Sequence, residues 1–143
     1  MADVHPKFDV ALVTPEGETF RGEAEMLVVP GAAGEIGVLA RHAPLVATLK
    51  AGSTRIYRDR ASEDVLEFAT GPGFFKVELD SAIALVDDAV DVKHIDDARA
   101  QEQLEAAKAE LAKVDAGESN ADRWQLEQRI KHAENQLTVS GRT

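Results

Sequence analysis

The chain has 143 residues, no cysteine, and 26 acidic against 16 basic side chains, which gives a formal net charge of -10 at pH 7. This length suits one well-cored domain with an appendage and is short for two ordinary domains. The absence of cysteine excludes disulfides, thiolate metal sites and thiol nucleophiles, and the negative charge argues against nucleic acid as a partner.

Residues 1–90 carry apolar side chains at every second position, which is the period of a strand with one buried face. A turn at residues 14–17, with Pro15 at its second position, predicts a hairpin. The expected inward-facing residues are Phe8, Val10, Leu12, Phe20, Ala24, Met26 and Val28. The expected outward-facing residues of the second stretch are Arg21, Glu23 and Glu25. Further short strands at 53–58, 64–70, 74–79 and 82–87 predict an all-β sandwich or flattened barrel.

From about residue 91 glycine and proline nearly vanish, and residues 91–143 predict an antiparallel α-helical hairpin as a second domain. Two apolar stripes at three- and four-residue steps consist of Leu104, Ala107, Leu111 and Val114, and of Leu126, Ile130, Ala133 and Leu137. Ser119 is the expected N-cap of the second helix, with Asp122 near its positive end. Because large aliphatic residues are few, we expect the hairpin to depend on docking and to exchange between arrangements.

The segment GEIGVLARHAPLVATLKAG, residues 34–52, raises the question of an active site. Glycines at 31, 34 and 37 match neither the dinucleotide fingerprint nor the phosphate-binding loop, and they favour a β-bulge and turn. Glu35 and His42 suggest an acid and a base, but no nucleophile with an orienting third group accompanies them. We therefore expect either surface side chains or a contact with another protein.

Other candidate sites are weaker. The four histidines show no metal-ligand spacing, so no metal is assigned. The longest stretch without charge is residues 26–34, broken by Pro30, whereas a membrane-spanning helix needs about 20 residues. No secretory signal is visible, so a cytoplasmic location is the default expectation. Asp96 and Arg99 lie three apart on one helix face, which most simply predicts a solvated ion pair.

Three motifs in order resemble the epsilon chain of F-type ATP synthases. The first runs from Glu35 through Leu39, followed by residues 42–45 (His-Ala-Pro-Leu) and 49–52 (Leu-Lys-Ala-Gly). The second is Gly-Pro-Gly-Phe at 71–74 with Val77, and the third is Ile-Asp-Asp-Ala-Arg-Ala at 95–100. The likeness spans nearly the whole chain.

This resemblance implies a non-catalytic subunit of the central rotary stalk that couples proton flow to rotation. It implies that the β-sandwich contacts the gamma chain and the proton-carrying ring of c subunits at the cytoplasmic face of the cell membrane. Glu35 matches an acidic loop residue near the ring, and His42, with Pro44 and Leu45, matches the interface region. The helices are expected to fold on the sandwich or to extend into the alpha/beta catalytic hexamer and block ATP hydrolysis.

The same resemblance implies a regulatory ATP contact at Ile95, Asp96, Arg99 and Ala100. Members that bind ATP carry arginines on the second helix, where this chain holds His132 and Gln136. An imidazole or amide does not replace the forked donors of arginine, so we expect weak ATP binding or none.

Two readings from other classes remain open at this point. One is a free-standing β-sandwich that binds carbohydrate or peptide, with a helical oligomerisation tail. Aromatic residues make up only 5% of the chain, with Tyr57 and Trp124 as the types that usually stack on sugars. The other, weaker reading is a hydrolase that uses Glu35.

Overall fold

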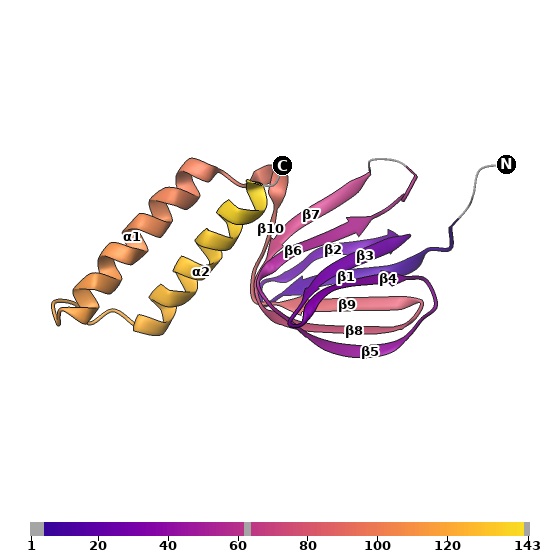
Figure 1. The fold of residues 1–143 in the computed structure, drawn as a ribbon, viewed down its shortest axis with the longest axis horizontal. Coiled ribbons are helices and arrows are strands. Elements are labelled where there is room, and N and C mark those ends of the chain that lie inside the picture. The colour runs from indigo at the N-terminus through magenta and orange to yellow at the C-terminus, as the bar shows by residue number, and fades with distance from the viewer. Residues whose placement is uncertain (1–4, 62–63, 142–143) are drawn as a thin grey trace. The chain divides into compact units, whose positions relative to one another are not determined.

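The computed structural model describes residues 5–61 and 64–141, which form two compact units divided after Asp91. The first unit is all-β and the second is helical, which confirms the predicted fold class (Figure 1). The strands are β1 (Phe8–Thr14), β2 (Gly17–Ala24), β3 (Met26–Gly31), β4 (Gly34–Leu39), β5 (His42–Leu49), β6 (Gly52–Tyr57), β7 (Val65–Thr70), β8 (Gly73–Leu79), β9 (Ser81–Val86) and β10 (Ala89–Asp91).

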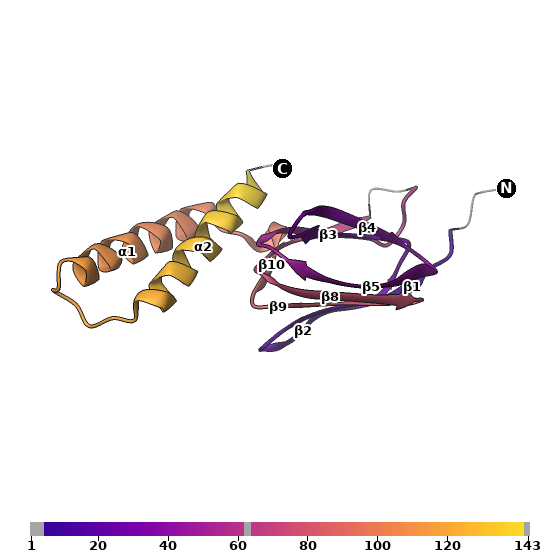
Figure 2. The same cartoon turned by 60° about the horizontal axis from the view of Figure 1, so that its bottom comes forward.

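The strands lie in two layers (Figure 2). One layer contains β4, β3, β6, β7 and β10, and the other contains β5, β8, β9, β1 and β2. All pairs are antiparallel except β1 with β9. The layers join where Gly31 of β3 pairs with Leu49 of β5, so one sheet continues from layer to layer through this pair. A single sheet is thus folded over at this pair into the two layers of a β-sandwich that approaches a flattened barrel.

The space between the layers is filled by apolar side chains. Its largest fully buried members are Phe8, Leu12, Leu27, Val29, Val38, Ile56, Phe75 and Val77. Two threonines, Thr54 and Thr70, are also buried and hydrogen-bond to each other through their hydroxyls at 2.9 Å. Pairing of the two hydroxyls satisfies polar groups that would otherwise be costly to bury.

The inward assignment was correct for β1 and wrong for β3. Leu27 and Val29 are buried, whereas Met26 and Val28 are only half-buried. The chain bends at Glu25, between β2 and β3, so the alternation shifts by one residue and the side chains of β3 exchange faces relative to the prediction. Glu25 is therefore buried rather than outward, and its carboxylate accepts the backbone N–H of Arg60 at 2.8 Å.

The helical unit contains a short 3-10 turn, η1 (Val92–His94), and helices α1 (Asp97–Asp115) and α2 (Arg123–Ser140). The Ser140 hydroxyl donates to the Asp97 carboxylate at 2.5 Å, which ties the end of α2 to the start of α1. Both predicted stripes carry buried residues, among them Leu104, Leu126 and Ala133. The predicted hairpin is therefore present.

The cap of α2 differs from the prediction. Asp122, not Ser119, is the N-cap, and its carboxylate accepts the backbone N–H groups of Trp124 and Gln125. The Ser119 hydroxyl instead donates to Glu110 and accepts from the N–H of Ala121, inside the connecting loop. The loop runs three residues longer than the sequence suggested, and its turn uses Gly117 at a φ of 75°.

Candidate functional site

The segment of residues 34–52 forms strands rather than an irregular loop. β4 and β5 are joined by a turn at residues 40–41, and Gly34 adopts a φ of 141° where the chain turns from β3 into β4. The β3–β4 ladder is continuous from Met26↔Leu39 to Gly31↔Gly34. The turn predicted at these glycines is therefore present, but the bulge is not. The irregularity lies instead in β5, between His42 and Leu45.

Glu35 lies at the beginning of β4 on the surface of the β unit. Its carboxylate pairs with the guanidinium of Arg55 at 3.1 Å, with side-chain exposures of 57% for Glu35 and 27% for Arg55. Arg55 lies on β6. Strand β3 lies between β4 and β6, because Val28 of β3 pairs with Gly37 on one side and with Arg55 on the other. The less exposed guanidinium of Arg55 therefore reaches across β3 and positions the accessible carboxylate of Glu35.

His42 lies at the beginning of β5 opposite Leu79 of β8. Its Nδ1 lies 2.6 Å from the carbonyl oxygen of Ala43, so Nδ1 carries the proton in this contact. Pro44 is exposed and Leu45 is half-buried. These residues lie at one end of the β unit.

The structure separates Glu35 from His42. Glu35 pairs with Pro30, and the Pro30 carbonyl accepts the N–H of Lys50, which follows the last residue of β5. Glu35 therefore lies near the end of β5, whereas His42 is its first residue. A strand rises about 3.4 Å per residue, so the ends of β5 are on the order of 20 Å apart. Two groups at this separation cannot act on one bond, and the hydrolase reading loses its acid–base pair.

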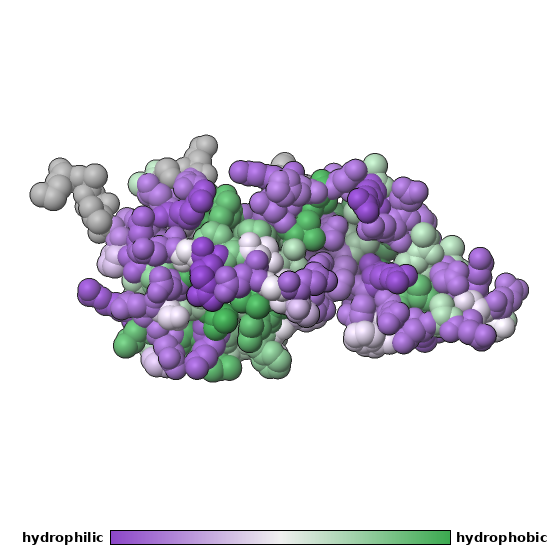
Figure 3. All heavy atoms as spheres, turned by 180° about the vertical axis from the view of Figure 1, so that it is seen from behind, coloured by the Kyte–Doolittle hydropathy of each residue, from purple (hydrophilic) through white to green (hydrophobic). Residues whose placement is uncertain are grey.

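Sequence reasoning missed an apolar patch on the outer face of β5, β8 and β9. Val46 is 70% exposed, Phe74 61% and Leu85 47%, and these three residues define the apolar patch. Phe74 pairs with Leu85 across the β8–β9 ladder. Seen from behind, apolar surface gathers on the lower part of the β unit, at the height where Figure 1 draws these strands (Figure 3). Adjacent phenylalanines at 74 and 75 were the available signal, because neighbours in a strand cannot both face the core.

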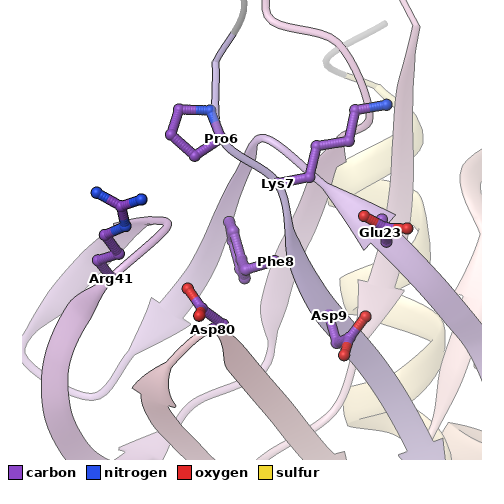
Figure 4. A pocket seen from close by; sticks show the side chains of 7 residues that line it. All are labelled: Pro6, Lys7, Phe8, Asp9, Glu23, Arg41 and Asp80. Atoms are coloured by element: carbon purple, nitrogen blue, oxygen red, sulfur yellow. The ribbon is translucent and has the colours of Figure 1, made fainter.

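A hollow of about 360 Å³ lies at the end of the β unit where β1 begins (Figure 4). It is lined by Pro6, Lys7, Phe8, Asp9, Glu23, Arg41 and Asp80. Two cations and three carboxylates share this open surface, so no single charge dominates it. Neither Glu35 nor His42 contributes to the hollow.

The residues of the predicted ATP contact lie at the start of α1. Asp96 is the N-cap, and its carboxylate accepts the backbone N–H of Arg99 at 3.1 Å. Ala100 is buried and the Arg99 side chain is exposed. Asp96 thus contacts the backbone of Arg99, where the sequence suggested an ion pair between side chains.

Within residues 5–61 and 64–141, no three His, Asp or Glu side chains are grouped so that they could hold a metal ion. Over the same ranges, each helix is too short or too polar to cross a membrane.

Comparisons with known proteins agree on one family. A family profile described as "ATP synthase, Delta/Epsilon chain, beta-sandwich domain" matches residues 7–92. The "ATP synthase epsilon chain" of Laribacter hongkongensis is 40% identical over 122 residues, which cover 85% of this chain and 86% of that protein.

Two solved structures share the fold at low identity. A chain of the Euglena gracilis mitochondrial ATP synthase OSCP/F1/c-ring structure has a TM-score of 0.64 and 19% identity, covering 97% of this chain and 81% of its own. A chain of the Tetrahymena thermophila mitochondrial ATP synthase central stalk/c-ring structure has a TM-score of 0.55 and 14% identity, with 96% of both chains covered.

Proposed function

Because the chain belongs to the ATP synthase delta/epsilon chain family, we propose that it is the epsilon chain of a proton-translocating ATP synthase, a non-catalytic subunit of the central stalk. The observation that carries this proposal is the 40% identity to an epsilon chain over 85% of the chain, together with the family match over the β unit. In this role the protein couples proton translocation to ATP synthesis.

The β unit suits the foot of a rotating stalk. Its two layers are joined at the Gly31–Leu49 pair and share one apolar core, so torque applied to one face is transmitted to the other. The apolar patch fits the gamma chain, because apolar surface of this kind is stabilised when a partner covers it.

The interface residues divide between the two ends of β5. Glu35 faces the polar loops of the c ring, where an accessible carboxylate favours a basic partner. His42, Pro44 and Leu45 belong to the surface that contacts gamma. The complex places the protein at the cytoplasmic face of the cell membrane, as a peripheral subunit.

The helical unit modulates ATP hydrolysis by reaching the alpha/beta hexamer. Its buried residues include three alanines, Ala100, Ala107 and Ala133, so little apolar area holds the two helices in one arrangement. A weakly held element can be moved by a ligand or partner of modest differential affinity.

ATP contacts Ile95, Asp96, Arg99 and Ala100 weakly in this proposal. The carboxylate of Asp96 already caps α1, and His132 and Gln136 supply no permanent positive charge on α2. We expect calorimetry of the purified chain with ATP to show no micromolar binding. A micromolar dissociation constant contradicts this expectation.

Reconstitution of a synthase depleted of its own epsilon chain tests the function. We expect the full chain to bind gamma and to restore proton-driven ATP synthesis. A chain that ends at Asp91 keeps the β unit and restores coupling, whereas ATP hydrolysis rises because the helices are gone.

Two outcomes contradict separate parts of the proposal. If neither version co-purifies with gamma, the stalk assignment is wrong. If hydrolysis is the same with and without residues 92–143, the modulatory role of the helices is wrong and the coupling role stands. Circular dichroism of the shortened chain verifies that its strands are formed.

A further inference from the structure

On the outer face of the layer that contains β4, β3, β6 and β7, one arginine lies between two carboxylates. The guanidinium of Arg55 on β6 pairs with Glu35 on β4 at 3.1 Å. On the other side of β6, Arg55 is the direct cross-strand partner of Glu67 on β7. The side chains that β3 places on this face are uncharged, namely Met26, Val28 and Pro30. Glu35 and Glu67 are therefore the carboxylates that flank Arg55.

Glu67 is held by a serine rather than by Arg55. Its Oε2 accepts the hydroxyl of Ser53 at 2.5 Å, and Ser53 is only 3% exposed. A carboxylate can accept several hydrogen bonds through its two oxygens. No described residue donates to Oε1 of Glu67. Ser53 thus positions the Glu67 carboxylate while one of its oxygens stays available.

Arg55 has a donor that the ion pair with Glu35 does not use. The pair is formed by Nη2, whereas Nε of Arg55 is buried and has no hydrogen-bond partner among the described residues. A guanidinium carries five N–H donors in a fixed fork, and a buried donor without a partner is unfavourable. A second carboxylate beside Arg55 would satisfy this donor.

The register of β6 and β7 brings Glu67 within reach of Arg55. Directly opposed residues of an antiparallel pair have Cβ atoms about 4.5–5.5 Å apart. The β6–β7 ladder runs without a shift from Gly52↔Thr70 to Tyr57↔Val65. Because both side chains are long and lie on the same face, rotation about side-chain bonds brings the guanidinium to Glu67. No change of strand pairing is needed.

We propose that Glu67 is a second acceptor for Arg55, and that the guanidinium moves from Glu35 to Glu67 when a lysine or arginine side chain of a partner binds Glu35. Without Glu67, such a partner would leave a guanidinium of 27% exposure with no counter-charge. With Glu67, the charge of Arg55 stays balanced, and the more exposed carboxylate becomes available. This inference rests on the proposed function only for the source of the partner's cation.

A fixed network makes a different prediction from this transfer. If Arg55 stays on Glu35 and Glu67 serves only to anchor Ser53, the two carboxylates contribute to stability independently. If Arg55 has two acceptors, loss of one carboxylate is compensated by the other. The two cases are therefore separated by whether the effects of substituting Glu35 and Glu67 add.

A double-mutant cycle on the full chain measures this additivity. Glu35→Gln and Glu67→Gln each leave Arg55 with one carboxylate, so we expect each to raise the unfolding equilibrium constant less than about threefold. Together they leave none, and we expect an effect at least about fivefold larger than the product of the single effects. The matched control combines Glu35→Gln with Glu23→Gln, because Glu23 is an exposed carboxylate of β2 in the other layer. Urea unfolding should show this control to be additive.

The Nε–H resonance of Arg55 reports the position of the guanidinium directly. We expect Glu35→Gln to slow the solvent exchange of this proton, because Arg55 then donates to Glu67. The double variant should lose this protection. A fixed network leaves the proton unchanged in Glu35→Gln. Additive stabilities together with an unchanged Nε–H resonance overturn the proposal.

Binding to the synthase depleted of its epsilon chain tests whether the partner uses the transfer. We expect Glu67→Gln to weaken binding about fivefold, because Arg55 then competes with the partner for Glu35. In a chain that already carries Glu35→Gln, the same substitution should have no further effect. Equal weakening in both backgrounds shows a merely structural role of Glu67 and contradicts the transfer, as does wild-type binding of Glu67→Gln.

Failure of the proposed function has a separate signature. If the wild-type chain does not bind the depleted synthase, the proposed function is wrong. The double-mutant cycle and the Nε–H resonance use the isolated chain, so they still decide whether Arg55 has two acceptors.

Discussion

Two glycines of the β unit differ sharply in their surroundings. A Cβ added to Gly73 would lie 1.9 Å from the carbonyl oxygen of Leu85 and 2.8 Å from the Cα of Val86. A Cβ added to Gly37 would meet nothing within 4 Å. Both glycines lie in the motifs that resemble the epsilon chain, but only Gly73 has a steric requirement. Backbone atoms of a paired strand cannot move aside as a flexible side chain can.

Alanine substitution at these two positions should therefore have opposite effects. We expect Gly73→Ala to lower the free energy of unfolding by about 2–3 kcal/mol, through overpacking against β9. Gly37→Ala is expected to raise it by about 0.5 kcal/mol, because alanine costs less entropy than glycine in a strand. Urea unfolding followed by circular dichroism measures both values. Equal stabilities of the two variants would contradict the steric argument.

The sequence did not predict the backbone conformation of two turn residues or the ion-pair partner of Glu35. Arg41 and Leu79 have φ angles of 62° and 43°, and the N–H of Arg41 donates to the carbonyl of Leu79 at 2.8 Å. Neither residue type favours this left-handed region. Likewise, the partner of Glu35 lies 20 positions along the chain at Arg55, a distance that no local pattern reports.

At the scale of elements, strands and helices differ in how firmly they are held. Strands of the β unit contribute fully buried side chains such as Phe75, Ile56 and Val29. In the helices the large apolar side chains buried to a comparable extent are Leu104, Leu126 and Val139, and Trp124 is 66% exposed. Cap and loop hydrogen bonds at Asp96, Asp122 and Ser119 define where the helices begin, but each contributes only about 1 kcal/mol.

Native-state amide exchange should resolve this difference. We expect amides of residues 101–137 to exchange faster than those of β6 and β8, because opening the hairpin exposes little apolar area. Exchange in the isolated chain, measured by NMR at several pH values, gives the opening free energy of each element. Equal protection of helices and strands would show that the hairpin is as firmly held as the core.

At the scale of the whole molecule, the chain consists of a two-layered β unit and a helical unit with distinct tasks in the proposed function. The β unit has a single core to which both layers contribute. The family match covers residues 7–92, which is nearly the whole of this unit. If the proposed function is right, removal of residues 92–143 leaves coupling in place and abolishes modulation, so the two activities can be measured independently.

Periodicity and composition were enough to predict the all-β unit, its first hairpin, the four strands β6 to β9 and the helical hairpin, because these depend on which residues alternate locally. The same local pattern gave the wrong buried face for β3, because the chain bends at Glu25 and this one residue shifts the alternation. The position of the apolar patch follows from pairing between strands far apart in sequence. Such pairing is set by packing of the layers, a long-range free energy that no short window of residues contains.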